Sequence, residues 1–176
     1  MNIALLGYGK MGKTIEKIAT DRGHKIVLTV DKDDSDYDLS GVDVAIDFSV
    51  PSAAVNNITK CITSGVPVVS GTTGWLERYD EVVQLCKEKA GAFIYASNYS
   101  LGVNLFFELN KKLAKMMNGV ADYTVTMEEI HHTQKLDAPS GTAITLAEGI
   151  IENSAKEKWN LDQGDESTIA ITAKRI

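Results

Sequence analysis

The fold of this chain is decided by its opening stretch, Asn2-Ile3-Ala4-Leu5-Leu6-Gly7-Tyr8-Gly9-Lys10-Met11-Gly12. An apolar run ended by a glycine predicts a short buried strand over residues 3–6. Beyond the glycines, apolar residues recur at helical spacing, which predicts an amphipathic helix over residues 12–21, ended by Gly23. A strand, a glycine turn and a helix in this order form the first half of a βαβ unit.

The alternation of strand and helix patterns continues through the first hundred residues. Further strands are expected at residues 25–30, 42–48, 66–70 and 92–96, and further helices at residues 52–63 and 76–89. Such alternation is typical of an α/β fold, with a doubly wound parallel sheet of Rossmann type and helices on both faces. We therefore expect residues 1–101 to form a dinucleotide-binding domain.

The pattern changes near Leu101, where we place a domain boundary. A helix is expected at residues 104–117, a half-exposed strand at 122–130, a helix at 140–153 and a strand at 168–176. The alternation of apolar and polar residues over 122–130 favours a strand with one face in water over a buried parallel strand. Residues 102–176 are therefore expected to form an α+β substrate-binding domain.

The glycine turn fits the pattern G-x-G-x-x-G, which indicates a dinucleotide site when it joins a strand to a helix. Gly7 permits the tight turn, Gly9 lets a pyrophosphate approach the backbone, and Gly12 lets the helix pack against the strand. Asp31, after the second strand, is suited to bind the ribose diol of NAD, whereas Lys32 beside it is suited to the 2′-phosphate of NADP. Both cofactors stay open, as does a glycine turn that has lost its nucleotide.

Three expected strand ends carry small polar residues. They are Asp47-Phe48-Ser49, Gly71-Thr72-Thr73-Gly74 and Ala96-Ser97-Asn98-Tyr99-Ser100. Ligands of open parallel sheets bind beyond the carboxyl ends of the strands. These loops are therefore candidates to contact a nicotinamide ribose and carboxamide, the alternative being that they are ordinary turns.

The densest chemistry lies between the expected half-exposed strand and the helix that follows it. His131, His132 and Lys135 offer positive charge and transferable protons. Ser140 is placed to cap that helix, and a capped helix start followed by a glycine suits a carboxylate. The alternatives are an ordinary strand end, a metal site and a hydrolytic serine. Adjacent histidines without an HExxH pattern disfavour a metal, and no nucleophile elbow surrounds Ser140.

Composition narrows the remaining classes. The 176 residues carry a net charge of −6, and the basic residues form no stripe, which disfavours nucleic acid as a partner. No apolar run approaches the roughly 20 residues of a membrane-spanning helix. Cys61 and Cys86 are isolated, and no secretory signal leads the chain, so we expect a cytoplasmic protein.

These motifs together resemble the 4-hydroxy-tetrahydrodipicolinate reductase family, also called dihydrodipicolinate reductase. The resemblance is carried by the glycine turn, by Gly71-Thr72-Thr73-Gly74, by Asn98-Tyr99-Ser100-Leu101-Gly102-Val103-Asn104, and above all by His131-His132-x-x-Lys135-x-Asp137-Ala138-Pro139-Ser140-Gly141-Thr142-Ala143. The last motif is long and specific, and all four occur in the family's order.

The resemblance implies an NAD(P)H-dependent oxidoreductase of the diaminopimelate route to lysine, which binds no metal. Its substrate is a small dianionic ring, the dehydrated form of 4-hydroxy-tetrahydrodipicolinate, and its product is tetrahydrodipicolinate. In the family, the residue matching His131 gives and takes a proton, and that matching Lys135 donates one. The substrate carboxylates are bound by the residues matching His132, Gly141 and Thr142, beside the Ser140 cap.

The cofactor site that the resemblance and the motifs imply comprises Gly7, Tyr8, Gly9, Lys10, Met11, Gly12, Asp31, Lys32, Gly71, Thr72, Thr73, Ala96, Ser97, Asn98 and Tyr99. Members of the family continue past the position of Ile176, where a mixed open sheet is completed that also builds a homotetramer. The second domain is therefore expected to be truncated relative to the family. Two other functions stay open: another imine or amino-acid dehydrogenase, such as an aspartate dehydrogenase, and an NAD(P)-binding protein without turnover.

Overall fold

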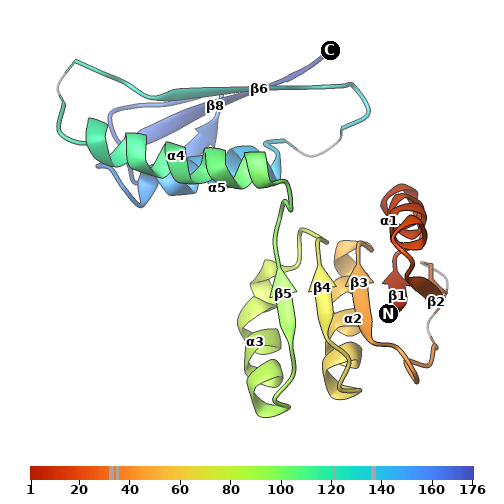
Figure 1. Cartoon of the computed structure of the whole chain (residues 1–176). Coiled ribbons are helices and arrows are strands. Elements are labelled where there is room, and N and C mark those ends of the chain that lie inside the picture. The colour runs from red at the N-terminus through yellow and green to blue at the C-terminus, as the bar shows by residue number, and fades with distance from the viewer. Residues whose placement is uncertain (32–33, 35, 121, 136–137) are drawn as a thin grey trace. The chain divides into compact units, whose positions relative to one another are not determined.

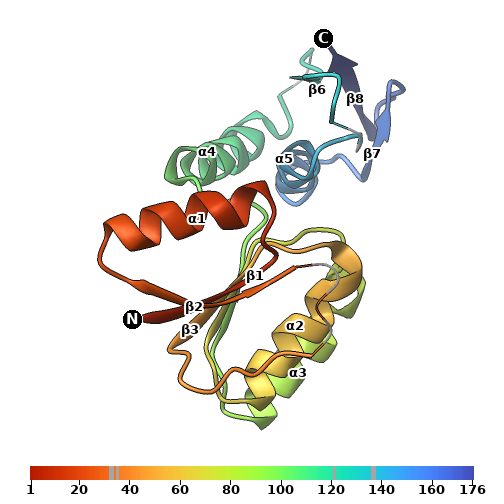
Figure 2. The same ribbon diagram turned by 90° about the vertical axis from the view of Figure 1, so that its right-hand side faces the viewer.

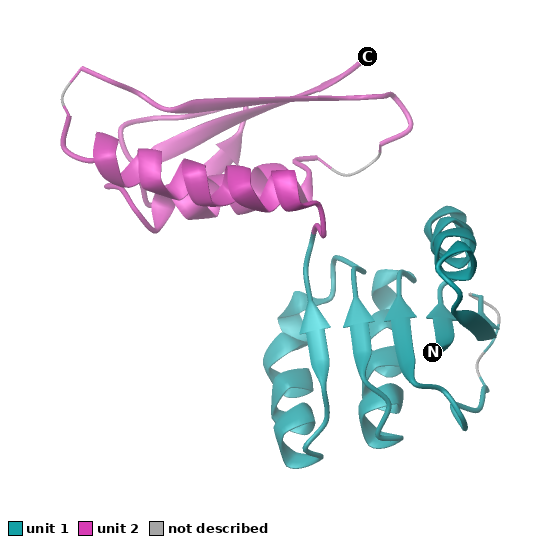
Figure 3. Ribbon diagram, in the orientation of Figure 1, with its two compact units in different colours: residues 1–97 teal, residues 98–176 magenta. Residues whose placement is uncertain are grey.

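The computed structural model describes residues 1–31, 34, 36–120, 122–135 and 138–176, so Lys32 lies outside the described residues. The chain divides into two compact units (Figure 3), Met1–Ser97 and Asn98–Ile176. Each unit has its own sheet and its own apolar core.

Unit 1 is built on a five-stranded sheet in which every pairing is parallel. Its strands are β1 (Asn2–Leu6), β2 (Lys25–Val30), β3 (Val44–Asp47), β4 (Val68–Ser70) and β5 (Phe93–Tyr95), in the spatial order β2-β1-β3-β4-β5 (Figure 1). Its helices are α1 (Lys10–Asp21), α2 (Pro51–Thr63) and α3 (Tyr79–Glu88), with a short 3₁₀ turn η1 (Leu76–Arg78). Helix α1 covers one face of the sheet, and α2 and α3 cover the other (Figure 2). The predicted Rossmann-type fold is confirmed.

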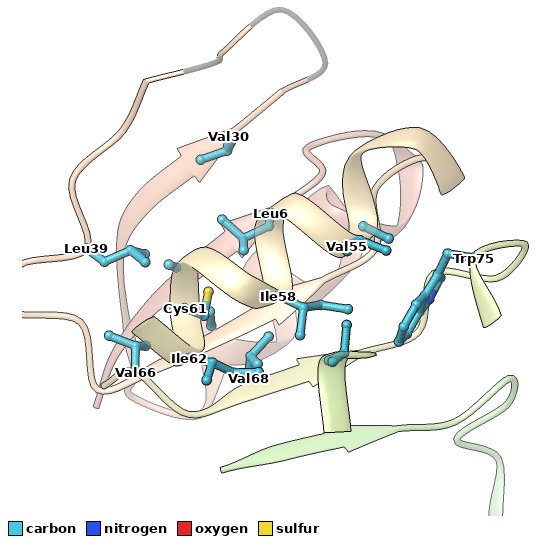
Figure 4. Packing of buried hydrophobic residues seen from close by; sticks show 14 residues of the cluster. Leu6, Val30, Leu39, Val55, Ile58, Cys61, Ile62, Val66, Val68 and Trp75 are labelled. Atoms are coloured by element: carbon cyan, nitrogen blue, oxygen red, sulfur yellow. The ribbon is translucent and has the colours of Figure 1, made fainter. Parts of the chain in front are cut away.

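The core of unit 1 explains why its first strand is an almost continuous apolar run. Alternate residues of β1 are buried on opposite faces, Ile3 against the α1 side and Ala4 against the α2 side. On the larger side, Ile58 and Ile62 of α2 lie against Val68 of β4 (Figure 4). A strand that is buried on both faces reads as a continuous apolar run, as the opening stretch does.

Unit 2 combines two helices with a three-stranded sheet. Its elements are α4 (Leu101–Met117), β6 (Thr126–His131), α5 (Gly141–Ile151), β7 (Lys158–Leu161) and β8 (Thr168–Arg175), and the strand order is β6-β8-β7. Residues of α5 form a core with Ile169 and Ile171 of β8 and with Met127 of β6. The other face of β6 is exposed, as its alternating sequence predicts.

The second, smaller sheet that the sequence predicts is present in unit 2, and both strand pairings in its described residues are parallel. The mixed sheet predicted for the family's complete domain stays a prediction. The chain returns through α5 between β6 and β7, and folds back over residues 162–167 between β7 and β8, so the strands start from the same end. Strand β7 was not predicted. Of its four side chains only that of Trp159 is half-buried, so the sequence shows no alternation of apolar and polar residues there.

Helix α4 has an apolar face whose surroundings its periodicity does not predict. Phe107 is buried, but Leu105, Leu109, Leu113 and Met116 are 62%, 61%, 55% and 76% exposed. The helical spacing therefore identified the apolar face correctly without showing whether anything covers it. No helix in the described residues is long and apolar enough to cross a membrane.

Candidate functional site

The parallel sheet of unit 1 brings the carboxyl ends of its five strands to one edge. Strand β1 pairs with β2 on one side and with β3 on the other, so the winding of the chain reverses direction at β1. Such a reversal leaves a crevice beyond the strand ends, where open α/β sheets bind their ligands. The glycine turn follows β1 and therefore lies at this crevice.

The three glycines of the turn are needed for two different reasons. Gly7 has φ +98°, and an added Cβ would lie 2.2 Å from the carbonyl oxygen of Phe48. A Cβ on Gly12 would lie 2.3 Å from the carbonyl oxygen of Gly7, so both positions exclude a side chain to let backbone segments touch. A Cβ on Gly9, in contrast, would meet nothing within 4 Å. Gly9 therefore borders open space, which fits the backbone approach of a pyrophosphate.

Helix α1 begins at this open space in a form suited to an anion. Its N-cap, Gly9, provides no side-chain cap, and its first turn holds no acidic residue. The first amides of a helix lack partners within the helix and carry a partial positive charge. Lys10 and Met11 are exposed at the start of the helix, and the hydroxyl of Tyr8 donates a hydrogen bond to Glu16. The residues present fit a dinucleotide phosphate.

Asp31 directly follows β2 at the same edge of the sheet and is exposed. Its backbone N–H donates to the Oδ2 atom of Asp34 at 2.8 Å. This bond fixes a second carboxylate beside Asp31 at the end of β2. The local charge is therefore acidic among the residues that the structure describes here.

A buried carboxylate joins the ends of β3 and β4. Asp47 is fully buried, and its two oxygens accept four hydrogen bonds from neutral groups. The donors are the hydroxyls of Ser49 (2.7 Å), Ser70 (2.8 Å) and Thr72 (2.7 Å) and the side-chain amide of Asn57 (3.1 Å). Because the hydroxyl of Thr72 is taken up in this way, the residue anchors its loop, and the exposed Thr73 is the better candidate to meet a ligand.

The network continues from Asp47 to Tyr37, a half-buried tyrosine. The Tyr37 hydroxyl donates to Oδ1 of Asn57 at 2.9 Å, which turns the amide of Asn57 toward Asp47. Burial, with smaller contributions from Cys61 and Asp47, raises the pKa of Tyr37 to about 12. The tyrosine therefore keeps its proton and remains a donor at neutral pH. Ser49, whose N–H donates to the Thr72 hydroxyl at 2.8 Å, is held by the same network.

Replacing Asp47 by asparagine is expected to lower the free energy of unfolding of unit 1 by about 1–3 kcal/mol, because one acceptor oxygen becomes an amide donor among four donors. The measurement is chemical denaturation followed by circular dichroism. The matched control is Asp36→Asn, since the side chain of Asp36 is fully exposed and its Oδ1 lies 3.7 Å from Nζ of Lys60. Equal stability of the two variants would show that the network contributes nothing.

The loop predicted at residues 96–99 spans the boundary between the units. Ala96 directly follows β5, and its N–H donates to the Ser70 carbonyl at 3.2 Å. Asn98 belongs to unit 2, where its side chain accepts from the Ser100 N–H at 2.8 Å and its carbonyl accepts from Asn104 at 3.0 Å. Unit 1 thus carries Ala96 and Ser97, and unit 2 carries Asn98 and Tyr99.

In unit 2, the histidine–lysine segment lies at the end of β6. Met127, Glu129 and His131 alternate along the strand on its less exposed face. Met127 packs on the core with α5, and the next two residues of this face continue toward the start of that helix. Oε2 of Glu129 lies 3.2 Å from Nε2 of His131.

The start of α5 forms as the sequence predicts. The Ser140 hydroxyl accepts a hydrogen bond from the N–H of Ala143 at 3.2 Å, so Ser140 is the N-cap. The N–H of Ser140 itself donates to both oxygens of Glu129, at 3.0 and 3.1 Å. Gly141 opens the helix, and an added Cβ there would meet nothing within 4 Å. The helix start is therefore open at the position expected to receive a carboxylate.

Lys135 and His132 lie in a turn between β6 and α5. The Lys135 N–H donates to the His132 carbonyl at 3.1 Å, and the Lys135 carbonyl accepts from Nε of Arg175 at 3.0 Å. Arg175, at the end of β8, also places its Nη1 3.7 Å from Oε1 of Glu129. One guanidinium thus holds both the backbone of Lys135 and the carboxylate beside His131.

Glu129 is charged in this setting. Burial alone would raise its pKa, but hydrogen bonds from Ser140 and His131 outweigh the burial and hold the pKa of Glu129 below its usual value. Because the folded state lowers this pKa, the stabilisation is present above the unfolded pKa and is lost as pH falls through the folded one. The sequence did not point to Glu129 or Arg175 as residues of the site. The i, i+2 spacing of Glu129 and His131, which puts both on one face of a strand, could have indicated Glu129.

The described residues hold no group of three or more His, Cys, Asp or Glu that is arranged to bind a metal ion. Cys61 and Cys86 are free thiols, the first buried.

Comparison with known proteins gives matches along the whole chain. Residues 1–99 match the family described as "Dihydrodipicolinate reductase, N-terminus", and residues 102–176 match "Dihydrodipicolinate reductase, C-terminus". A protein named 4-hydroxy-tetrahydrodipicolinate reductase from Christiangramia forsetii is 62% identical over 99% of this chain and 74% of its own length. A protein of the same name from Thermosipho africanus is 35% identical over 83% of this chain and 65% of its own length.

Solved structures show the same fold. A dipicolinate-bound dihydrodipicolinate reductase from Paenisporosarcina sp. TG-14 has a TM-score of 0.70 and 23% identity, covering 99% of this chain and 79% of that one. Aspartate semialdehyde dehydrogenase II from Vibrio cholerae, complexed with ASA, has a TM-score of 0.51 and 12% identity, covering 99% of this chain and 67% of that one.

Proposed function

Because the chain belongs to the dihydrodipicolinate reductase family, we propose that it reduces the dehydrated, cyclic form of 4-hydroxy-tetrahydrodipicolinate to tetrahydrodipicolinate with NADH or NADPH. This reaction belongs to the diaminopimelate route to lysine. The proposal rests on one observation above all. A single chain carries both an open glycine turn at a parallel sheet edge and a histidine–lysine turn beside an open helix start.

The cofactor side of the proposal rests on unit 1. A bound dihydronicotinamide would supply a hydride to one carbon of the substrate's reacting double bond. The glycine turn and the start of α1 bind the pyrophosphate through backbone amides, and Asp31 accepts hydrogen bonds from the adenosine ribose. Asp47 keeps the loops after β3 and β4 in place, so that Thr73 and Ser97 can meet the nicotinamide half.

The proton side of the proposal rests on unit 2. Hydride addition leaves negative charge on the substrate, and one proton must be added to complete the reduction. His131 and Lys135 supply this proton, and the open start of α5 at Gly141 and Thr142, with His132, binds the substrate carboxylates. The family-type homotetramer and the cytoplasmic location stay predictions.

The test is consumption of NADH and of NADPH, followed by the absorbance of the reduced nicotinamide, with the substrate generated in place from pyruvate and aspartate semialdehyde by the preceding enzyme. Consumption that requires both precursors would support the proposal. Tight cofactor binding without consumption would contradict it and favour a protein that binds the nucleotide without turnover. Omission of pyruvate is the control for side reactions.

Replacing Asp31 by alanine is expected to weaken NADH binding by about tenfold and NADPH binding much less, because the ribose diol of NADH loses its charged acceptor. Fluorescence titration of each cofactor measures the two dissociation constants. Asp36→Ala, in the same loop, is the control for loss of a negative charge. The same change in both dissociation constants would contradict the assignment of Asp31 to the ribose.

A further inference from the structure

A carboxylate that no motif pointed to organises the histidine–lysine segment. The side chain of Glu129 is only 10% exposed, although it carries a charge. It meets three groups from three elements: Nε2 of His131 on β6, the N–H of Ser140 before α5, and the guanidinium of Arg175 on β8. Burial of a charge is costly unless it is compensated, so this arrangement calls for a reason beyond packing.

We infer that Glu129 is a positioning residue that fixes the tautomer of His131, so that Nδ1 is the ring atom that exchanges a proton with the substrate. An ionised carboxylate only accepts hydrogen bonds, so the nitrogen that faces it has to carry the hydrogen. In neutral His131 that nitrogen is Nε2, which leaves Nδ1 unprotonated. The proton that His131 gives to the substrate is therefore the one that Nδ1 carries when the ring is doubly protonated. The exchange of a proton between Nδ1 and the substrate rests on the proposed function of His131. The tautomer of His131 does not.

The two oxygens of Glu129 face different side chains, so replacing one oxygen by an NH₂ group, as in glutamine, tests the inference. Oε1 faces Arg175 at 3.7 Å, and Oε2 faces His131 at 3.2 Å, while the Ser140 N–H reaches both. Glutamine has the same shape but only one acceptor oxygen. Because Arg175 can only donate, the oxygen of a glutamine will face Arg175, and its NH₂ group will face His131. That NH₂ group then requires an unprotonated Nε2, and the hydrogen moves to Nδ1.

The charged neighbours of Glu129 support this reading. Arg175 also donates to the carbonyl of Lys135, so the same pair of side chains fixes the histidine ring and the backbone of the lysine. The charge of Glu129 is therefore placed where it orients both proposed proton donors. Glu128, the adjacent residue of β6, is instead exposed and pairs with Lys174.

The experiment is ¹⁵N–¹H correlation spectroscopy of the full chain with labelled histidine, in wild type and in Glu129→Gln. The three histidines are assigned through His24→Gln and His132→Gln variants. In wild type we expect neutral His131 to carry its hydrogen on Nε2, and in Glu129→Gln on Nδ1. The matched control is Glu128→Gln, which removes the same charge from the other face of β6 and is expected to leave the tautomer unchanged.

Steady-state kinetics complete the test. Glu129→Gln is expected to lower kcat by about 10²-fold, with an unchanged KM for NADH, because proton transfer is lost while the cofactor site is intact. A wild-type hydrogen on Nδ1 would overturn the inference, even if Glu129→Gln failed to fold. So would an unchanged tautomer in a folded Glu129→Gln. An inverted tautomer with full kcat would leave the positioning correct but would remove His131 from the proposed proton transfer, which His131→Ala would then show separately.

Discussion

Gly7→Ala is expected to unfold unit 1, whereas Gly9→Ala, two residues away, is expected to keep it folded. The added Cβ at Gly7 would lie 2.2 Å and 2.5 Å from the carbonyl oxygen and carbon of Phe48 and 2.7 Å from Cα of Ser49. All three atoms belong to the backbone at the end of β3, so relief requires β1 and β3 to separate. With a φ of +98° as a further strain, the expected loss is about 4 kcal/mol or more, the range of exceptional single substitutions.

Gly9→Ala serves as the matched control because its Cβ would enter open space and its φ is −78°. Only a small loss at the helix N-cap is expected, on the order of a few tenths of a kcal/mol to about 1 kcal/mol. The same methyl group would, however, stand where the proposed pyrophosphate approaches. Denaturation by urea and titration with NADH therefore separate the two roles. Gly7→Ala should lose stability, and Gly9→Ala should lose NADH affinity while it stays stable.

The opposite result would be informative for each position. A stable Gly7→Ala protein would mean that the end of β3 can move away from β1 at little cost. A Gly9→Ala protein with normal NADH affinity would show that the pyrophosphate does not lie against this turn, and it would remove the main support for the cofactor side of the proposed function.

The sequence predicts unit 1 well because its elements follow from local patterns. Buried parallel strands are continuous apolar runs, and each helix has one apolar face, so residues 2–6 and 51–63 can be assigned without knowledge of their partners. Once the strands are known to be parallel, their carboxyl ends must lie at one edge. The approximate place of Gly7, Asp31 and Gly71 in the site follows from that alone.

Unit 2 was harder to predict because its sheet depends on pairings that the sequence does not encode locally. Strand β7 has four residues, of which only Trp159 is half-buried, so it gives almost no periodic signal. The alternation in β6 shows that one face is exposed, and exposed faces are commoner in antiparallel sheets. Here the sheet is parallel and still half-exposed, since the helices α4 and α5 lie on one side only.

The contacts inside the site were the least predictable part. Thr72 and Ser70 bind the carboxylate of Asp47 across 25 and 23 residues of sequence, and Lys135 and Arg175 meet across 40. Sequence reasoning therefore placed Asp47 and Thr72 at the cofactor loops but did not show that they bind each other. Glu129 was passed over for the same reason: its role depends on Ser140 and Arg175, which only the fold brings to it.

Replacing Lys135 by alanine is expected to lower kcat by about 10²–10⁴-fold, the usual contribution of a positioned proton donor. The dissociation constant for NADH should stay nearly the same, because Lys135 belongs to unit 2 and the glycine turn to unit 1. Two backbone hydrogen bonds of Lys135 hold the turn: its N–H donates to the His132 carbonyl, and its carbonyl accepts from Arg175. Alanine keeps both of these bonds.

Lys174→Ala is the matched control, since Lys174 is an exposed lysine of β8 paired with Glu128 and should leave kcat unchanged. Single-turnover kinetics and NADH titration of Lys135→Ala, His131→Ala and the double variant then decide how the two residues act. If they act in one proton transfer, the double variant should be about as slow as the slower single variant, because groups that work as a unit are not additive. Multiplicative losses would instead indicate two independent steps. A comparable loss of NADH affinity in either single variant would contradict the assignment of these residues to the substrate side of the site.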